Sequence, residues 1–123
     1  MIVRSLEELI GTDRDVDWAH GRSRRFLLEK DGMGFTLTDT VVDAGSESIL
    51  AYPSHLEACY CIEGEGEVED SSGNRFPIKP GTMYALDKHD EHRVRAATTM
   101  RLVCVFSPAL SGGERGSYDS TRK

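Results

Sequence analysis

The stretch that decides the fold reads Glu57-Ala58-Cys59-Tyr60-Cys61-Ile62-Glu63-Gly64-Glu65-Gly66-Glu67-Val68. Its first half carries the aromatic, β-branched and cysteine side chains that are typical of a β-strand. The Gly-x-Gly that follows indicates a tight turn, and the next strand begins at once. This stretch therefore predicts two consecutive strands joined by a short connection.

The same pattern extends in both directions along the chain. Short apolar runs are separated by turn signals such as Asp31-Gly32 and Pro80-Gly81. We expect nine strands, at residues 25–28, 34–40, 48–52, 58–63, 66–69, 74–78, 82–86, 91–96 and 100–106. A short helical turn is expected at residues 5–10 and a polar loop at 13–23. This pattern favours an all-β sandwich or barrel.

Length and composition indicate one domain followed by a tail. A chain of 123 residues with 38% hydrophobic residues can build one compact core. We expect this barrel domain to span residues 1–110. Residues 111–123 are glycine, serine and charged residues without apolar periodicity, which predicts a flexible polar tail or lid that is mobile without ligand.

Charge and cysteine content set expectations about partners and compartment. A formal net charge of −6 argues against binding to nucleic acid or to an anionic membrane. No apolar run reaches the roughly 18 residues of a membrane span, and the first residues lack a signal-peptide core. The three cysteines are an odd number, and Cys59 and Cys61 share one strand face. We therefore expect a cytoplasmic protein with reduced thiols.

Two segments resemble the signature motifs of the cupin superfamily. In the first, Glu57 is followed after six residues by Gly64, and in the second, Gly81 leads to His92. The His-x-His pair that usually precedes the glutamate is replaced by Leu50 and Tyr52. The resemblance implies a single cupin-type barrel of the jelly-roll kind, with a metal site around Glu57 and His92.

Tyr84 is a candidate for the third metal ligand. On the strand expected at 82–86 it shares a face with residues two positions away, so its phenol could point into the barrel beside Glu57 and His92. A carboxylate, a phenol and an imidazole suit Fe²⁺, with Zn²⁺ or Mn²⁺ also possible. Two alternatives stay open: Tyr84 could be an ordinary core residue, and Glu57 and His92 could form a buried ion pair.

Other polar residues have weaker signals. The cluster Arg22, Arg24 and Arg25 could grip a carboxylate or could lie on a solvated edge. His55 and His89 lie in polar loop settings, although His55 could support a ligand from behind.

A closer resemblance is to the ectoine synthase family. It is carried by Glu57 to Glu69 and by further strings at residues 1–4, 29–35, 77–81, 86–92 and 104–108, and it runs from Met1 to about Glu114. The resemblance implies an iron-dependent homodimer, in which the N-terminal segment could be a swapped strand. The implied reaction is closure of N-γ-acetyl-L-2,4-diaminobutyrate to ectoine with loss of water.

The resemblance also implies roles for individual residues. It places the metal on Glu57, Tyr84 and His92. It implies substrate contacts from Arg25, Thr40, Tyr52, Cys104, Phe106 and Glu114. A Lewis-acidic metal would activate the amide, Arg25 could hold the α-carboxylate, and either Tyr52 or Glu114 could move the protons.

The chain departs from the family at some of the implied contacts. The family's tryptophan before its arginine is absent from residues 21–25, and Thr38 stands where an asparagine is expected. The tail after Glu114 also differs. Two alternative functions therefore stay open: a metal cupin acting on another small N-acyl or amino acid, and a non-catalytic cupin that binds such a solute.

Overall fold

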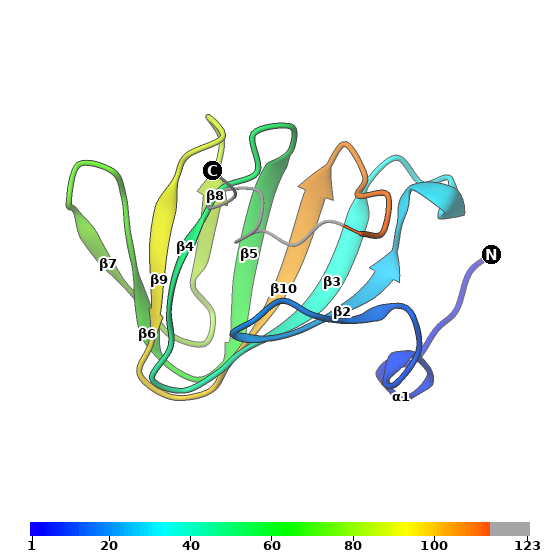
Figure 1. Ribbon diagram of the computed structural model, residues 1–123, viewed down its shortest axis with the longest axis horizontal. Coiled ribbons are helices and arrows are strands. Elements are labelled where there is room, and N and C mark those ends of the chain that lie inside the picture. The colour runs from blue at the N-terminus through cyan, green and yellow to red at the C-terminus, as the bar shows by residue number, and fades with distance from the viewer. Residues whose placement is uncertain (114–123) are drawn as a thin grey trace.

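Ten strands form two facing antiparallel sheets in a computed structural model, which describes residues 1–113 (Figure 1). The six-stranded sheet has the order β1 (Asp15–Asp17), β2 (Gly21–Leu27), β3 (Thr36–Val42), β10 (Met100–Ser107), β5 (Leu56–Glu63) and β8 (Met83–Leu86). The four-stranded sheet has the order β4 (Glu47–Leu50), β9 (His92–Ala96), β6 (Gly66–Glu69) and β7 (Arg75–Ile78). The predicted all-β fold is confirmed.

The core lies between the inner faces of the two sheets. In β10 the alternate residues Met100, Leu102, Cys104 and Phe106 are buried, as the two-residue period of a strand requires. From the facing sheet, Val94 and Val68 join the same apolar cluster. The long β5 and β10 strands therefore form the wall against which the smaller sheet packs.

The N-terminal helical turn is confirmed as α1 (Leu6–Leu9). Ser5 caps it, because its hydroxyl accepts the amide of Glu8 while the Glu8 carboxylate accepts the amide of Ser5. A single 3-10 turn, η1 (Glu29–Asp31), connects β2 to β3. No helix among the described residues is long and apolar enough to cross a membrane.

The prediction of a loop at residues 13–23 is wrong, because these residues form β1 and the start of β2. Val16 is buried between two aspartates, and the guanidinium of Arg22 pairs with Asp15 at 3.0 Å. These charges lie on the outer side of the sheet and hide the alternation in the sequence. The remaining predicted strands are found with ends shifted by at most two residues, apart from 25–28, which begins at Gly21 instead.

Gly64 is required by the turn between β5 and β6. Its φ is +84°, and an added Cβ would lie 2.1 Å from the carbonyl oxygen of Thr99. We expect Gly64→Ala to lower the free energy of unfolding by about 3 kcal/mol or more, because left-handed strain adds to a clash with backbone. Denaturant unfolding of the purified variant measures this loss.

Gly73 offers the matched control for that substitution. Its φ of +87° is nearly the same, but no atom lies within 4 Å of the position of an added Cβ. Gly73→Ala should cost only the backbone strain, about 1–2 kcal/mol. Equal losses in the two variants would show that the contact with Thr99 is unimportant.

Candidate active site

A cavity of about 50 Å³ lies between the two sheets. Seven of the residues predicted to form the site line it: Arg25, Thr40, Tyr52, Glu57, Tyr84, Cys104 and Phe106. Trp18, Ser23, Cys59 and several aliphatic side chains complete the lining. The structure thus brings together residues that are up to about eighty positions apart in the sequence.

Strand register explains how the cavity wall is built. Cys59 on β5 lies between Cys104 on β10 and Tyr84 on β8, so these three side chains form one row across the sheet. Glu57 lies one row further along, opposite Phe106. Because alternate residues of a strand share a face, Glu57 and Cys59 both point inward.

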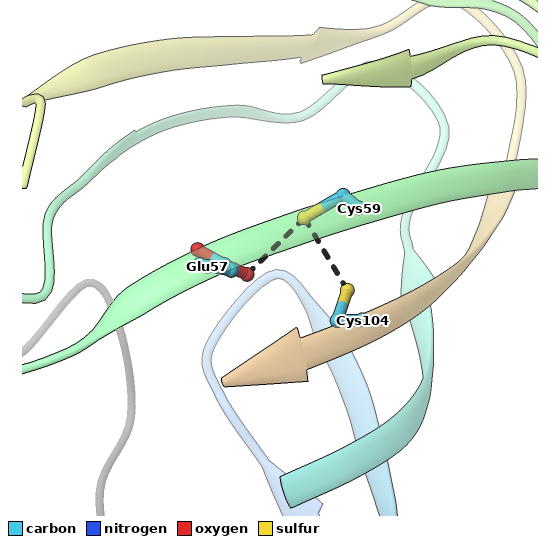
Figure 2. Close-up of side chains that lie close together, drawn as sticks. All are labelled: Glu57, Cys59 and Cys104. Atoms are coloured by element: carbon cyan, nitrogen blue, oxygen red, sulfur yellow. Dashed lines mark hydrogen bonds between the residues drawn. The ribbon is translucent and has the colours of Figure 1, made fainter. Parts of the chain in front are cut away.

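The carboxyl group of Glu57 is removed from bulk water. This burial raises its pKa from the ordinary value to about 7. The thiol of Cys59 donates a hydrogen bond to Oε2 of Glu57, with 3.2 Å between sulfur and oxygen (Figure 2). The group is therefore poised to lose its proton near neutral pH.

His92 enters the site from β9 on the facing sheet and is only 4% exposed. Its Nδ1 lies 3.0 Å from the carbonyl oxygen of Asp90. Because a carbonyl can only accept, Nδ1 carries the proton and Nε2 keeps its lone pair. This Nε2 is buried and has no hydrogen-bond partner among the described residues. Burial also lowers the pKa of His92, which keeps the ring neutral. A neutral ring held by one nitrogen and unsatisfied at the other is the arrangement of a metal ligand.

Tyr84 connects the other two candidate ligands. Its ring meets the His92 ring edge to face, with 5.9 Å between the centroids. Burial, followed by the nearby thiol and carboxyl groups, raises the pKa of its phenol well above the ordinary value. His92 does not line this cavity but a second pocket, and its ring contact with Tyr84 is what links it to the other candidate ligands. Within the described part of the chain, no ion pair between Glu57 and His92 is formed, and Nε2 of His92 has no hydrogen-bond partner.

These residues fit a divalent metal ion. A carboxylate, a phenol and an imidazole with a bare nitrogen supply oxygen and nitrogen donors of the kind that iron, zinc and manganese accept. The orphaned Nε2 would gain the partner that a buried polar atom needs. A second group of donor atoms, from Glu57, Cys59 and Cys104, lies within 4.8 Å of one another.

Arg25 and two aromatic rings form another part of the lining. Arg25 is only 1% exposed, its Nε donates to Ser23, and one of its amino groups donates to the carbonyl of Gly112 at 2.8 Å. The rings of Tyr52 and Phe106 meet at 4.7 Å between centroids. The arginine cluster of the sequence therefore divides: Arg25 turns inward, whereas Arg22 and Arg24 form ion pairs with aspartates.

The remaining predicted residues lie around this centre or outside the description. The hydroxyl groups of Thr38 and Thr40 are hydrogen-bonded to each other at 2.8 Å. Nδ1 of His55 contacts the carbonyl oxygen of Pro108, and Nδ1 of His89 contacts those of Tyr52 and His55. Glu114 and the tail from residue 114 onward lie outside the described residues.

Trp18 and Cys59 line the cavity, but the sequence did not single them out as site residues. Trp18 is 5% exposed and its Nε1 donates to the carbonyl of Val41 at 3.1 Å. Val16 and Trp18 are apolar residues two positions apart, and this alternation could have predicted a strand with Trp18 on its inner face. Trp18 therefore reaches the cavity from the end of β1.

The fold is that of the cupin barrels. A cupin 2 conserved barrel domain protein from Salinispora arenicola superposes with a TM-score of 0.69, covering 87% of this chain and 88% of that one at 20% identity. At this identity the likeness concerns the fold alone. It confirms the prediction of a cupin-type barrel.

Much closer relatives are ectoine synthases. The L-ectoine synthase of Desulfatibacillum aliphaticivorans is 58% identical over 122 residues, covering 97% of this chain and 94% of the relative. That of Halalkalibacterium halodurans is 54% identical, with 93% and 89% covered. The crystal structure of ectoine synthase from P. lautus has a TM-score of 0.90 at 55% identity, covering 93% of this chain and 83% of that one. The family model for ectoine synthase matches residues 1–121. This chain therefore belongs to the ectoine synthase family, and the predicted class of enzyme is confirmed.

Proposed function

We propose that this protein closes the ring of N-γ-acetyl-L-2,4-diaminobutyrate to give ectoine and water, with a metal ion held by Glu57, Tyr84 and His92. Membership of the family supports the reaction. The observation that carries the site is the buried lone pair of Nε2 of His92, next to the ring of Tyr84. Nothing in the relatives favours another substrate or a non-catalytic solute binder.

The proposed cofactor is Fe²⁺, with Zn²⁺ or Mn²⁺ as other ions that the same donors accept. When bound, the ion supplies Lewis acidity toward the oxygen of the acetamide group. The protein's contribution is a fixed imidazole tautomer: the Asp90 carbonyl holds the proton on Nδ1 and so keeps Nε2 available.

Substrate positioning is proposed for Arg25, Tyr52 and Phe106. The buried guanidinium of Arg25 is suited to the α-carboxylate, because a planar fork matches a carboxylate with two hydrogen bonds. The edge-to-face pair of Tyr52 and Phe106 offers an apolar surface on which the aliphatic chain can curl. Curling brings the α-amine to the acetamide carbon and removes much of the entropic barrier. Thr40 and Cys104 are proposed as further contacts from the same wall.

The reaction is balanced without any further reactant. The α-nitrogen forms a bond to the acetamide carbon, and the carbon–oxygen bond breaks. The oxygen leaves as water with two protons that the nitrogens release, which gives the cyclic amidine. A base must first take a proton from the α-ammonium and an acid must protonate the leaving oxygen. Tyr52 lines the described cavity and is proposed for one of these roles, with Glu114 as the other candidate.

Product formation tests this function. We expect purified protein loaded with Fe²⁺ to convert N-γ-acetyl-diaminobutyrate to ectoine, followed by chromatography. Absence of ectoine from protein with bound iron would rule the reaction out. Tight binding of ectoine in the same sample without turnover would instead favour a solute-binding protein.

The pH dependence of the affinity for Fe²⁺ should change near pH 7. The ion must displace the proton of Tyr84, whose pKa is raised, at any pH in this range. Below about 7 it must also displace the proton of Glu57, since the pKa of that group is about 7. We therefore expect the affinity to rise about 100-fold per pH unit below pH 7 and about tenfold per unit above it. Chelator competition between about pH 6 and 8 measures both slopes, and a single slope without a break would contradict the role of Glu57.

A homodimer is proposed from the free edge of the six-stranded sheet. β8 ends that sheet, and the apolar side chains of Met83 and Tyr60 are exposed beside it. Met1, Ile2 and Val3 are also exposed, and in Figure 1 the N-terminus lies far across the molecule from β8. Pairing of this segment with β8 thus requires a second copy. Removal of residues 1–3 should shift the protein from dimer to monomer in sedimentation, and an unchanged dimer would contradict this interface.

The compartment and the tail are also proposals. The three cysteines are free and buried, which supports a reducing, cytoplasmic setting. Residues 111–123 are proposed as a flexible polar tail or lid, and at its beginning Arg25 donates a hydrogen bond to the carbonyl of Gly112.

A further inference from the structure

The thiol of Cys59 lies between the carboxyl group of Glu57 and the thiol of Cys104. Its sulfur is 3.2 Å from Oε2 of Glu57 and 3.4 Å from the sulfur of Cys104 (Figure 2). Both cysteines are 2% exposed and are not joined by a disulfide. Figure 2 shows the two thiols and the carboxyl group converging from neighbouring strands β5 and β10.

The directions of these hydrogen bonds follow from the chemistry of the groups. An ionised carboxylate has no proton, so the thiol of Cys59 must donate to Oε2. The proton of Cys59 is then committed to Glu57, and the thiol of Cys104 donates to the sulfur of Cys59. The result is a short chain of donors that ends on one oxygen of the carboxylate.

We propose that Cys59 is a positioning residue for the metal site. Its hydrogen bond engages Oε2 of Glu57 and restrains the carboxylate group, so that Oε1 would remain available to bind the ion. Groups that form hydrogen bonds to a metal ligand typically contribute 10–100-fold to metal affinity. This inference rests on the proposed function, because it assumes that Glu57 binds the metal.

Cys61 provides a control that distinguishes the positioning role of Cys59 from a contribution to core packing. It lies on the same strand and the same face as Cys59, and it is fully buried. Its thiol donates to the carbonyl oxygens of Glu63 and Gly64, away from the candidate ligands. Substitution of Cys61 therefore removes a buried thiol from the core without touching Glu57.

The experiment compares Fe²⁺ affinity in four proteins: wild type, Cys59→Ala, Cys59→Ser and Cys61→Ala. Fe²⁺ is titrated without oxygen against a chromogenic chelator, and the metal-free proteins are unfolded in denaturant as a check on the fold. We expect Cys59→Ala to weaken Fe²⁺ binding by about 10–100-fold. Cys59→Ser keeps a donor next to Oε2 and should restore most of the affinity, while Cys61→Ala should bind as wild type does.

Two outcomes would overturn the proposal. One is wild-type affinity in Cys59→Ala, and the other is an equal loss in Cys59→Ala and Cys61→Ala, which would indicate packing. If Cys59→Ala does not fold, the serine variant carries the test, because loss of Fe²⁺ binding with the donor retained contradicts the proposed role. Failure of wild type to bind Fe²⁺ would refute the proposed metal set itself and is thereby distinguishable.

Discussion

His92→Ala is expected to lose its bound metal and to lower kcat/KM by at least about a thousandfold, because metal activation of the amide supplies several kcal/mol. The buried Nε2 has no hydrogen-bond partner among the described residues. Loss of this atom therefore removes a proposed metal ligand without breaking a hydrogen bond. The same substitution removes the hydrogen bond from Nδ1 to Asp90. Metal analysis of the purified variant and steady-state kinetics measure the two effects.

His55→Ala serves as the control for metal content. Its Nδ1 contacts the carbonyl oxygen of Pro108, and the residue does not line the cavity. We expect this variant to keep its metal. His92→Ala with full metal occupancy and ordinary turnover would contradict the assignment of His92.

Arg25→Ala is expected to give the second largest loss, about 30-fold to several thousandfold in kcat/KM. Breaking a buried charge pair between protein and ligand costs about 2–5 kcal/mol, and Arg25 is the buried cation that lines the cavity. Arg25→Lys should recover little, because an ammonium group cannot form the paired hydrogen bonds of a guanidinium. The loss should fall mainly on KM, since the carboxylate is bound in both ground and transition states.

Arg22→Ala is the matched control for Arg25. Arg22 lies three positions earlier on the same strand, but its guanidinium pairs with Asp15 outside the cavity. Its substitution should leave kcat/KM near the wild-type value. An equal loss in both variants, or none in Arg25→Ala, would refute the proposed grip on the α-carboxylate.

Part of the inner wall of the site could be predicted from sequence. The resemblance to the cupin motif implied that Glu57 lies at the metal site, and the two-residue period of a strand allowed the phenol of Tyr84 to point inward; the structure places both side chains in the cavity. Tyr52 and Phe106 were expected from resemblance alone, whereas Arg25 was also a candidate as a member of the arginine cluster; all three line the cavity. Local pattern and family likeness therefore agree on this wall.

Other features depend on contacts between distant segments. β1 carries two aspartates in three residues, and its strand is supported by pairing with β2, including the ion pair between Asp15 and Arg22. The tautomer of His92 depends on the carbonyl of Asp90, and the thiol row of Cys59 and Cys104 depends on the register of β5 against β10. Neither is encoded in residue type or spacing, so the role of Cys59 emerged only from the fold.

The absorption spectrum of protein titrated with ferric iron tests the proposed metal set most directly. A phenolate bound to ferric iron gives a visible charge-transfer band, which carboxylate and imidazole ligands do not. We expect this band to appear with one equivalent of ferric iron in wild type and to be absent from Tyr84→Phe, whereas Tyr60→Phe, on the exposed face, retains it. No band in the iron-loaded wild type, or a band that persists in Tyr84→Phe, would contradict the metal site of Glu57, Tyr84 and His92.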